Sequence, residues 1–233
     1  MLLISPSDRL FVLTGAGVSA ESGIPTFRAV GGLWRNYHIE EVASPHAWKR
    51  DPRLVWEFYF MRRNVAAQAK PNPAHLALAR LEQQLGERFF LCTQNVDDLH
   101  EQAGSKHVVH MHGELFKSRC DTCTRLPFRD TNTYDPSAEL PRCECGGLIR
   151  PHICWFGEVP FELERIFRAL DECTIFIAVG TSGMVEPAAS FVAQVHGHAR
   201  TIYVGPEEPA NAGSFTECHL AKAGEVLPVL LGI

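Results

Sequence analysis

Apolar and polar positions along this chain follow two different periods. Short runs of β-branched and aromatic residues predict buried strands, and stretches with a helical repeat separate them. The expected strands are residues 10–14, 88–93, 174–180 and 200–205. Buried strands that alternate with helices are typical of a parallel sheet with helices on both faces. The pattern therefore predicts an α/β fold.

The expected helices are marked by the residues at their ends. A helix is expected over residues 52–69, because Asp51 is available as its cap and Pro52 lies in its first turn. Prolines stop this helix before a second one begins near Asn72. A third helix is expected over residues 161–170.

The periodicity is lost between residues 115 and 150, where Cys, Asp, Thr, Pro and Gly dominate. This segment contains a Cys-x2-Cys pair and a Cys-x-Cys pair, separated by 19 residues. Four thiolates suit closed tetrahedral zinc, so we expect one structural zinc ion rather than a catalytic one. Cys145 is a better fourth ligand than Cys154, because two glycines follow it and permit a tight turn. The expected ligands are Cys120, Cys123, Cys143 and Cys145.

Composition narrows the class of protein. The 233 residues, 45% of them hydrophobic, fit one large domain or two small ones. A net charge of -5 disfavours nucleic acid as a partner, and no apolar stretch is long enough to span a membrane. The start of the chain lacks the features of a signal peptide, so we expect a cytoplasmic protein with free thiols. We also expect a monomer. Cys92 and Cys173 are expected to be small buried hydrophobic residues.

A glycine-rich turn follows the first expected strand. Residues 15–20 read GAGVSA, which matches the dinucleotide-binding fingerprint with alanine at the third small position. Such a turn lets a pyrophosphate approach the backbone and the start of the next helix, although an ordinary glycine turn would look the same. The acidic residue that dehydrogenases place about 20 residues later is missing, which disfavours hydride transfer.

Five segments in order resemble the signatures of the sirtuin family. They read GAGVSAESGIPTFR at 15–28, TQNVD at 93–97, HMHG at 110–113, FGE at 156–158 and GTS at 180–182. The resemblance extends from about residue 10 to 228 and implies a single catalytic domain with two parts. The Rossmann-like part would comprise residues 1–28, 75–117 and 151–233, and the small helical and zinc part residues 29–74 and 118–150. NAD and an acyl-lysine peptide would bind in a cleft between them.

The resemblance implies an NAD-dependent removal of acyl groups from protein lysines, giving nicotinamide and 2'-O-acyl-ADP-ribose. In this family the acyl oxygen attacks the ribose carbon that bears nicotinamide. His112 would then act as general base on the ribose, a task that suits an imidazole. Asn95 and Asp97 would orient the nicotinamide ribose and carboxamide. Without the motif, His112 would be taken for an ordinary loop histidine, and Asn95 and Asp97 for turn residues.

The remaining NAD contacts are implied by the same motifs. Phe27 and Arg28 resemble the loop that shields the reactive sugar from water. The family usually has an asparagine where this chain has Gly205, so Glu207 is the candidate substitute at the adenosine ribose. The full expected set is Gly15, Ala16, Gly17, Ser19, Ala20, Phe27, Arg28, Trp34, Gln94, Asn95, Asp97, Gly180, Thr181, Ser182, Gly205, Glu207 and Ala223.

Tyr59 and Arg62 are three residues apart on the expected helix and share a face. A guanidinium and a phenol together can hold a carboxylate. The pair resembles class III sirtuins, which implies a preference for succinyl and malonyl groups, with deacetylation at lower efficiency. Otherwise Arg62 would be a solvated helix charge like its neighbour Arg63. By analogy the peptide groove is lined by Ile153, Phe156, Gly157 and Glu158.

Three alternatives stay open at this point. A hydride-transferring NAD enzyme is disfavoured by the missing acidic residue. A protein ADP-ribosyltransferase would keep every cofactor residue and differ only in the acceptor. A non-catalytic zinc and NAD module that binds partners would not need His112.

Overall fold

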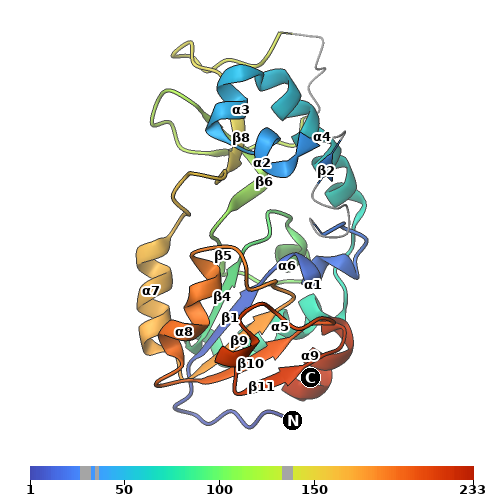
Figure 1. Ribbon diagram of the computed structural model, residues 1–233, viewed down its shortest axis with the longest axis vertical. Coiled ribbons are helices and arrows are strands. Elements are labelled where there is room, and N and C mark those ends of the chain that lie inside the picture. Colours follow the sequence, from blue (N-terminus) through green and yellow to red (C-terminus); the bar gives the residue numbers. More distant parts are fainter. Residues whose placement is uncertain (27–32, 35–36, 133–138) are drawn as a thin grey trace.

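The structure is a computed structural model that describes residues 1–26, 33–34, 37–132 and 139–233. Its centre is a parallel sheet of six strands in the order β11-β10-β9-β1-β4-β5 (Figure 1). The predicted α/β class and Rossmann-like sheet are confirmed. The strands are β1 (Leu10–Thr14), β4 (Phe89–Thr93), β5 (Val108–His110), β9 (Ile175–Val179), β10 (Arg200–Val204) and β11 (Glu217–His219).

Successive side chains of each strand point to opposite faces of the sheet, and helices bury both faces. Leu10 and Val12 of β1 pack in one core with helices α5 (Pro73–Leu85) and α9 (Ala223–Leu231). Phe11 and Leu13 pack in another core with α7 (Leu163–Glu172) and α8 (Phe191–Val195). Strands without a polar face explain why the sequence shows continuous apolar runs.

The strand order reverses between β1 and β9. From β1 the chain proceeds outward to β4 and β5, then returns to β9 on the other side of β1. Gly15 and Gly17 follow β1, and the N–H of Gly17 donates to the carbonyl of Gly180 after β9 at 2.8 Å. A Cβ on Gly17 would lie 2.7 Å from the Cα of Gly180, so these turns touch only because both are glycine. Ligands of open α/β sheets bind at such a reversal.

A smaller region lies above the carboxyl edge of the sheet (Figure 1). It holds an antiparallel sheet in the order β7-β6-β8, and its own core includes Trp48, Trp56 and Trp155. Its elements are α2 (Ile39–Val42), α3 (Pro45–Arg50), α4 (Pro52–Gln68), β6 (Gly113–Cys120), β7 (Phe128–Arg129) and β8 (Ile149–Ile153), with β2 (Leu33–Trp34) paired to β3 (Tyr37–His38). Within the described ranges no helix is long and apolar enough to cross a membrane.

Some expected boundaries shift. Asp51 caps α4 as predicted, since its Oδ1 accepts from the N–H groups of Arg53 and Leu54, both at 3.1 Å. Helix α7 begins at 163 rather than 161, because Glu162 has a φ of 60° and cannot be helical. The loss of regular structure expected from residue 115 was wrong at its start, because β6 continues to Cys120. The buried Ser118 conceals the strand pattern there.

Two buried histidines pack against each other near the end of β1. The rings of His75 in α5 and His100 in α6 (Leu99–Gln102) are 4.9 Å apart between centroids, and both are at most 1% exposed. Nδ1 of His75 accepts from the N–H of Asn72 at 3.3 Å. Nε2 of His100 contacts Oγ1 of Thr14 at 3.0 Å. Burial lowers the pKa of His75 to about 4, and burial together with His75 and His110 lowers the pKa of His100 well below 6.5. Both rings are therefore neutral at neutral pH.

These histidines predict a loss of stability in acid. The unfolded chain binds a proton to His75 near pH 6.5, whereas the folded chain does so only near pH 4. The free energy of unfolding should therefore be highest above pH 6.5 and fall below it, by about 2 kcal/mol between pH 7 and 5 from His75 alone. Urea unfolding at both pH values measures this. The decrease should be smaller in His75→Asn and unchanged in His46→Gln, whose side chain is exposed; equal decreases in all three proteins would refute the assignment.

Candidate active site

The motif residues meet at the carboxyl ends of the central strands. Gln94 follows β4 and joins two neighbouring strand ends: its N–H donates to the carbonyl of Thr14 at 2.9 Å, and its Nε2 donates to Oγ1 of Thr181 at 3.1 Å. His112 follows β5, on the other side of β4. The ends of β9, β1, β4 and β5 therefore form one continuous edge that carries polar side chains.

Ser19, Asn95 and Asp97 form a buried chain of hydrogen bonds, each at most 7% exposed. Nδ2 of Asn95 donates to Oγ of Ser19 at 3.0 Å, and that hydroxyl donates to Oδ2 of Asp97 at 3.1 Å. Oδ1 of Asp97 accepts from the N–H of Leu99 at 3.2 Å. Burial raises the pKa of Asp97, although the N–H of Leu99 and the Ser19 hydroxyl oppose this. These hydrogen bonds fix the amide plane of Asn95 against helix α1 (Ala16–Ala20).

His112 is held in one tautomer. Its Nδ1 lies 3.1 Å from the carbonyl oxygen of Gln94, and a carbonyl can only accept, so Nδ1 carries the hydrogen. Nε2 therefore keeps its lone pair. Burial lowers the pKa of His112, with partial opposition from the Gln94 carbonyl, so the ring is neutral at neutral pH. A neutral imidazole with a bare Nε2 can remove a proton.

The neighbouring His110 differs in its electrostatics. Its Nδ1 lies 3.2 Å from the carbonyl of Asn95, and its Nε2 lies 2.6 Å from Oε1 of Glu101. Burial alone would lower the pKa of His110, but the Glu101 carboxylate raises it overall. His110 is thus suited to hold a proton and His112 to accept one, although they are two residues apart.

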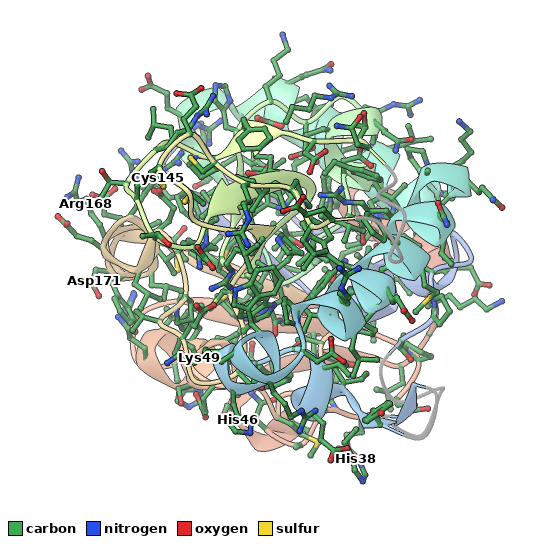
Figure 2. All side chains as sticks on the ribbon, turned by 90° about the horizontal axis from the view of Figure 1, so that it is seen from above. His38, His46, Lys49, Cys145, Arg168 and Asp171 are labelled. Carbon is green, nitrogen blue, oxygen red and sulfur yellow. The ribbon has the colours of Figure 1, made fainter. Side chains whose placement is uncertain are left out.

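The four clustered cysteines fit a zinc ion. Their Sγ atoms all lie within 4.8 Å of one another, with 3.5 Å between Cys120 and Cys145 and 3.7 Å between Cys123 and Cys143. A tetrahedron with Zn–S bonds of 2.3 Å has edges of about 3.8 Å. Cys145 lies at the surface, where Figure 2 labels it, while Cys120 and Cys143 are buried. All four positions are filled by sulfur, which fits a structural ion and confirms the predicted ligand set as a cluster.

Tyr59 and Arg62 lie side by side on α4. The guanidinium carbon of Arg62 is 5.9 Å from the centroid of the Tyr59 ring, and the Tyr59 hydroxyl accepts from Nε1 of Trp155 at 3.0 Å. Burial raises the pKa of Tyr59 to about 12 and lowers that of Arg62, which Tyr59 and Asp97 support in its charged form. Both groups are hydrogen-bond donors at neutral pH.

The adjacent Arg63 serves another purpose. Its Nε donates to the carbonyl of Leu115 at 2.8 Å, its NH1 lies 3.4 Å from Oδ2 of Asp130, and the side chain is 3% exposed. Arg63 therefore fastens α4 to β6. The sequence alone could not distinguish the two arginines.

The Sir2 family profile matches residues 15–187 of the chain. The chain belongs to the Sir2 family. It is 48% identical over 229 residues to the NAD-dependent protein deacylase of Pasteurella multocida, which covers 94% of this chain and 95% of that protein. It is 47% identical over 224 residues to the Escherichia coli enzyme of the same name, with 94% and 80% covered. A crystal structure of a Sir2 homolog–NAD complex aligns with a TM-score of 0.89 at 42% identity, covering 96% and 88%. A mutant Sir2 homologue with 2'-O-acetyl ADP-ribose aligns with a TM-score of 0.89 at 40% identity, covering 98% and 93%.

In this Sir2-family chain the turn after β8 is braced by charge. Glu158 accepts from both terminal nitrogens of Arg150, at 2.8 and 2.9 Å, and from the N–H of Trp155 at 2.8 Å. Gly157 has a φ of 87°, which favours glycine, and Phe156 is 47% exposed. Ile153 is buried at the end of β8. Glu158 thus holds the turn, and Phe156 presents its ring to solvent.

The departure at Gly205 has a structural reason. A Cβ at this position would collide with the hydroxyl of Tyr203, which donates to the carbonyl of Glu207 at 2.8 Å. The side chain of Glu207 is exposed beyond this contact, while Ala223 is buried at the first turn of α9. The sequence analysis did not single out Tyr203. The only signal for it would have been that an aromatic residue precedes the unusual Gly205 by two positions.

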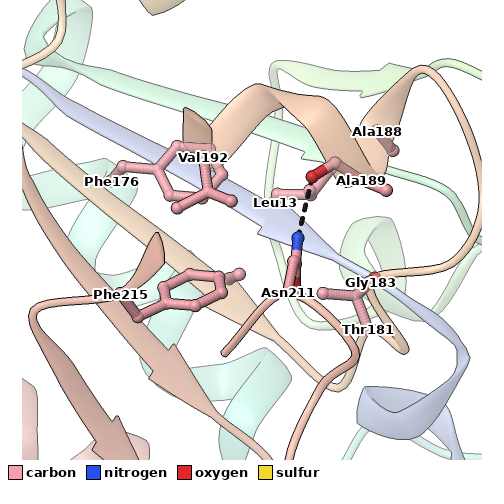
Figure 3. A pocket seen from close by; sticks show the side chains of 10 residues that line it. Leu13, Phe176, Thr181, Gly183, Ala188, Ala189, Val192, Asn211 and Phe215 are labelled. Carbon is pink, nitrogen blue, oxygen red and sulfur yellow. Dashed lines mark hydrogen bonds between the residues drawn. The ribbon is translucent and has the colours of Figure 1, made fainter. Parts of the chain in front are cut away.

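A narrow hollow, too tight to hold a water molecule, lies beside Thr181 (Figure 3). It is mostly apolar, with Phe176 and Phe215 among its lining residues, and Nδ2 of Asn211 donates to the carbonyl of Ala189 at 2.7 Å. Neither His112 nor Asn95 lines it. The hollow is therefore part of the core between the sheet and α8.

Some expected contacts lie outside the described residues. These are Phe27, Arg28 and the side chain of Trp34, whose backbone belongs to β2. The other expected residues lie at strand ends of both sheets, on α1 and α4, in the turn after β8 and at the start of α9.

Proposed function

We propose that this chain is an NAD-dependent protein lysine deacylase that yields nicotinamide and 2'-O-acyl-ADP-ribose. The observation that carries the proposal is the single tautomer of His112, whose bare Nε2 lies at the ligand-binding edge of the sheet. The Pasteurella and Escherichia relatives carry the corresponding name, and a solved homologue holds an O-acetyl ADP-ribose. Acyl-lysine proteins would be the substrates.

The residues at the strand ends would hold NAD as a co-substrate. When bound, NAD supplies a ribose carbon from which the acyl oxygen can displace nicotinamide. Asn95 and Asp97, fixed by Ser19, would orient the ribose and carboxamide. His112 would take the proton of a ribose hydroxyl on Nε2 while Gln94 keeps the ring in place. The glycine turn after β1 and the segment 180–182 would receive the phosphates and the adenosine half.

The reaction is tested by mixing the protein with NAD and an acetyl-lysine or succinyl-lysine peptide, then following nicotinamide and peptide mass. A deacylase releases nicotinamide and lowers the peptide mass by the acyl group. An ADP-ribosyltransferase would raise that mass instead, and a hydride-transferring enzyme would form NADH. A binding module would leave NAD intact.

We further propose that the enzyme prefers succinyl and malonyl groups to acetyl. Tyr59 is a buried donor and Arg62 a half-buried one beside it, and a guanidinium in such a position is stabilised by an anionic partner. The distal carboxylate of a succinyl group would accept hydrogen bonds from both side chains, whereas an acetyl group has no carboxylate with which to do so.

Arg62→Met is expected to lower kcat/KM for a succinyl-lysine peptide by about 50-fold, as loss of a charge-assisted bidentate pair would. For the matched acetyl-lysine peptide we expect a change of less than about threefold, because no carboxylate is involved. Steady-state kinetics with both peptides measure the ratio. Arg53→Met, the same substitution at an exposed position of α4, should not alter it. An unchanged ratio in Arg62→Met would sink the acyl preference and leave the deacylase proposal standing.

A further inference from the structure

We propose that Trp155 is a positioning residue for acyl selectivity: its indole N–H occupies the Tyr59 oxygen and so fixes the phenol as a donor toward a carboxylate. The inference rests on the proposed function and deepens it. According to this inference, the indole N–H contributes to the selectivity for an acyl group that ends in an anion over a neutral acyl group of the same shape.

The argument begins with hydrogen-bond roles. An indole nitrogen can only donate, so in the 3.0 Å contact between Nε1 of Trp155 and the Tyr59 hydroxyl the phenol oxygen accepts. The phenol proton must then point elsewhere. The phenol oxygen also interacts with Arg62, whose guanidinium can likewise only donate to it.

Arg62 cannot receive that proton, because a guanidinium has five donors and no acceptor. It nevertheless lies against the phenol and interacts with it electrostatically. Two neighbouring groups thus offer donors to the same place. A carboxylate supplies acceptors for both, whereas a carboxamide brings its own N–H groups and no charge.

Trp155 is rigid enough to impose this polarity. The side chain is 2% exposed, and the guanidinium carbon of Arg150 lies 3.3 Å from its ring centroid. Arg150 is fixed by Glu158, which also accepts from the N–H of Trp155. The Trp48 ring lies 5.7 Å away. The same charged brace that holds the turn 154–158 therefore holds the indole against Tyr59.

The test compares kcat/KM for three peptides of one sequence, carrying succinyl-lysine, its neutral terminal carboxamide analogue, or acetyl-lysine. Trp155→Phe keeps an aromatic ring and removes the N–H. We expect it to lower the succinyl value about tenfold, to leave the acetyl value within about twofold, and to narrow the preference for succinyl over the carboxamide. Trp56→Phe removes another indole of the same core, whose N–H bonds to the carbonyl of Ile149, and should leave all ratios unchanged.

A double-mutant cycle with Tyr59→Phe separates positioning from packing. If Trp155 acts through the phenol, Trp155→Phe has no further effect on the succinyl to acetyl ratio once Tyr59 is Phe. Equal losses for all three peptides, or an added loss in the Tyr59→Phe background, would overturn the inference. Absence of nicotinamide release with every peptide and the unmodified protein would instead reject the proposed function.

The hydrogen bond can also be measured without activity. The indole N–H resonance of Trp155, assigned by its disappearance in Trp155→Phe, should shift upfield and exchange faster with solvent in Tyr59→Phe. If the chemical shift and solvent exchange of this resonance were unchanged in Tyr59→Phe, the inference would be overturned even if the enzyme kinetics agreed with it.

Discussion

His112→Asn is expected to lower kcat by about 10²- to 10⁴-fold for acetyl- and succinyl-lysine peptides alike, the range that a positioned general base contributes. Asparagine can still donate to the Gln94 carbonyl and nearly fills the site, but it has no basic nitrogen in place of Nε2. Because the loss concerns proton transfer rather than acyl recognition, both substrates should suffer together.

The affinity for NAD separates a catalytic role from a structural one. We expect the dissociation constant of NAD, measured by calorimetry, to change by less than about threefold in His112→Asn, since a base that acts on the ribose in the transition state adds little to ground-state binding. His107→Gln, whose side chain is 76% exposed directly before β5, should behave as the unmodified protein. Retention of more than a tenth of the activity in His112→Asn would refute its role as the base.

The pH dependence of kcat/KM should carry the signature of the same residue. The deprotonated ring is the active form, and burial lowers the folded pKa of His112 below 6.5. Activity should therefore rise with pH through that lowered pKa and be level at neutral pH, with no further increase near 6.5. His112→Asn should lose this acidic limb.

The centre of the fold was predictable because its strands are buried on both faces. The sequence predicted residues 10–14, and β1 has those bounds; β9 and β10 deviate by no more than one residue at each end. The edge strands β5 and β11 were not predicted, since three residues are too few to display a period. Helix α9 was also missed, and Pro228 inside it breaks the helical signal.

The motifs single out candidate active-site residues along the chain, but they do not reveal the residues that these contact. Tyr59 and Trp155 are separated by 96 positions, and no local pattern relates them. The same holds for Arg63 and Leu115, whose contact makes this arginine structural. Motifs mark the positions of candidate functional residues along the chain. Which of their groups donate or accept hydrogen bonds depends on contacts that only the tertiary fold creates.

Replacement of Cys143 by alanine, or removal of the metal with a chelator, is expected to lower the free energy of unfolding by at least about 3 kcal/mol and Tm by about 10 °C. Three thiols cannot close the tetrahedral site, so the turns at 120–123 and 143–147 would lose the ion that joins them. Metal release should amount to one zinc ion per chain, measured with a chromogenic chelator.

The damage should extend to the core that includes Tyr59 and Trp155. Cys120 and Cys143 belong to the core that contains Trp48, Trp56 and Trp155. Nε1 of Trp48 donates to Asp121, which directly follows Cys120, and Nε1 of Trp56 donates to the carbonyl of Ile149. We therefore expect the near-ultraviolet circular dichroism of the tryptophans and the deacylase activity to be lost together. The far-ultraviolet signal of the helices on the parallel sheet should largely remain, because their two cores do not include the zinc cysteines.

Cys218→Ala provides the matched control, because this exposed thiol lies on β11, far from the cluster in sequence and outside it in space. It should leave zinc content, Tm and activity unchanged. If Cys143→Ala retained a full complement of zinc, or lost it without any change in tryptophan signals, the ion would not support the core that holds Trp155 against Tyr59. Selectivity for the acyl group would then have to be independent of the metal, contrary to the shared packing of Cys120, Cys143 and Trp155.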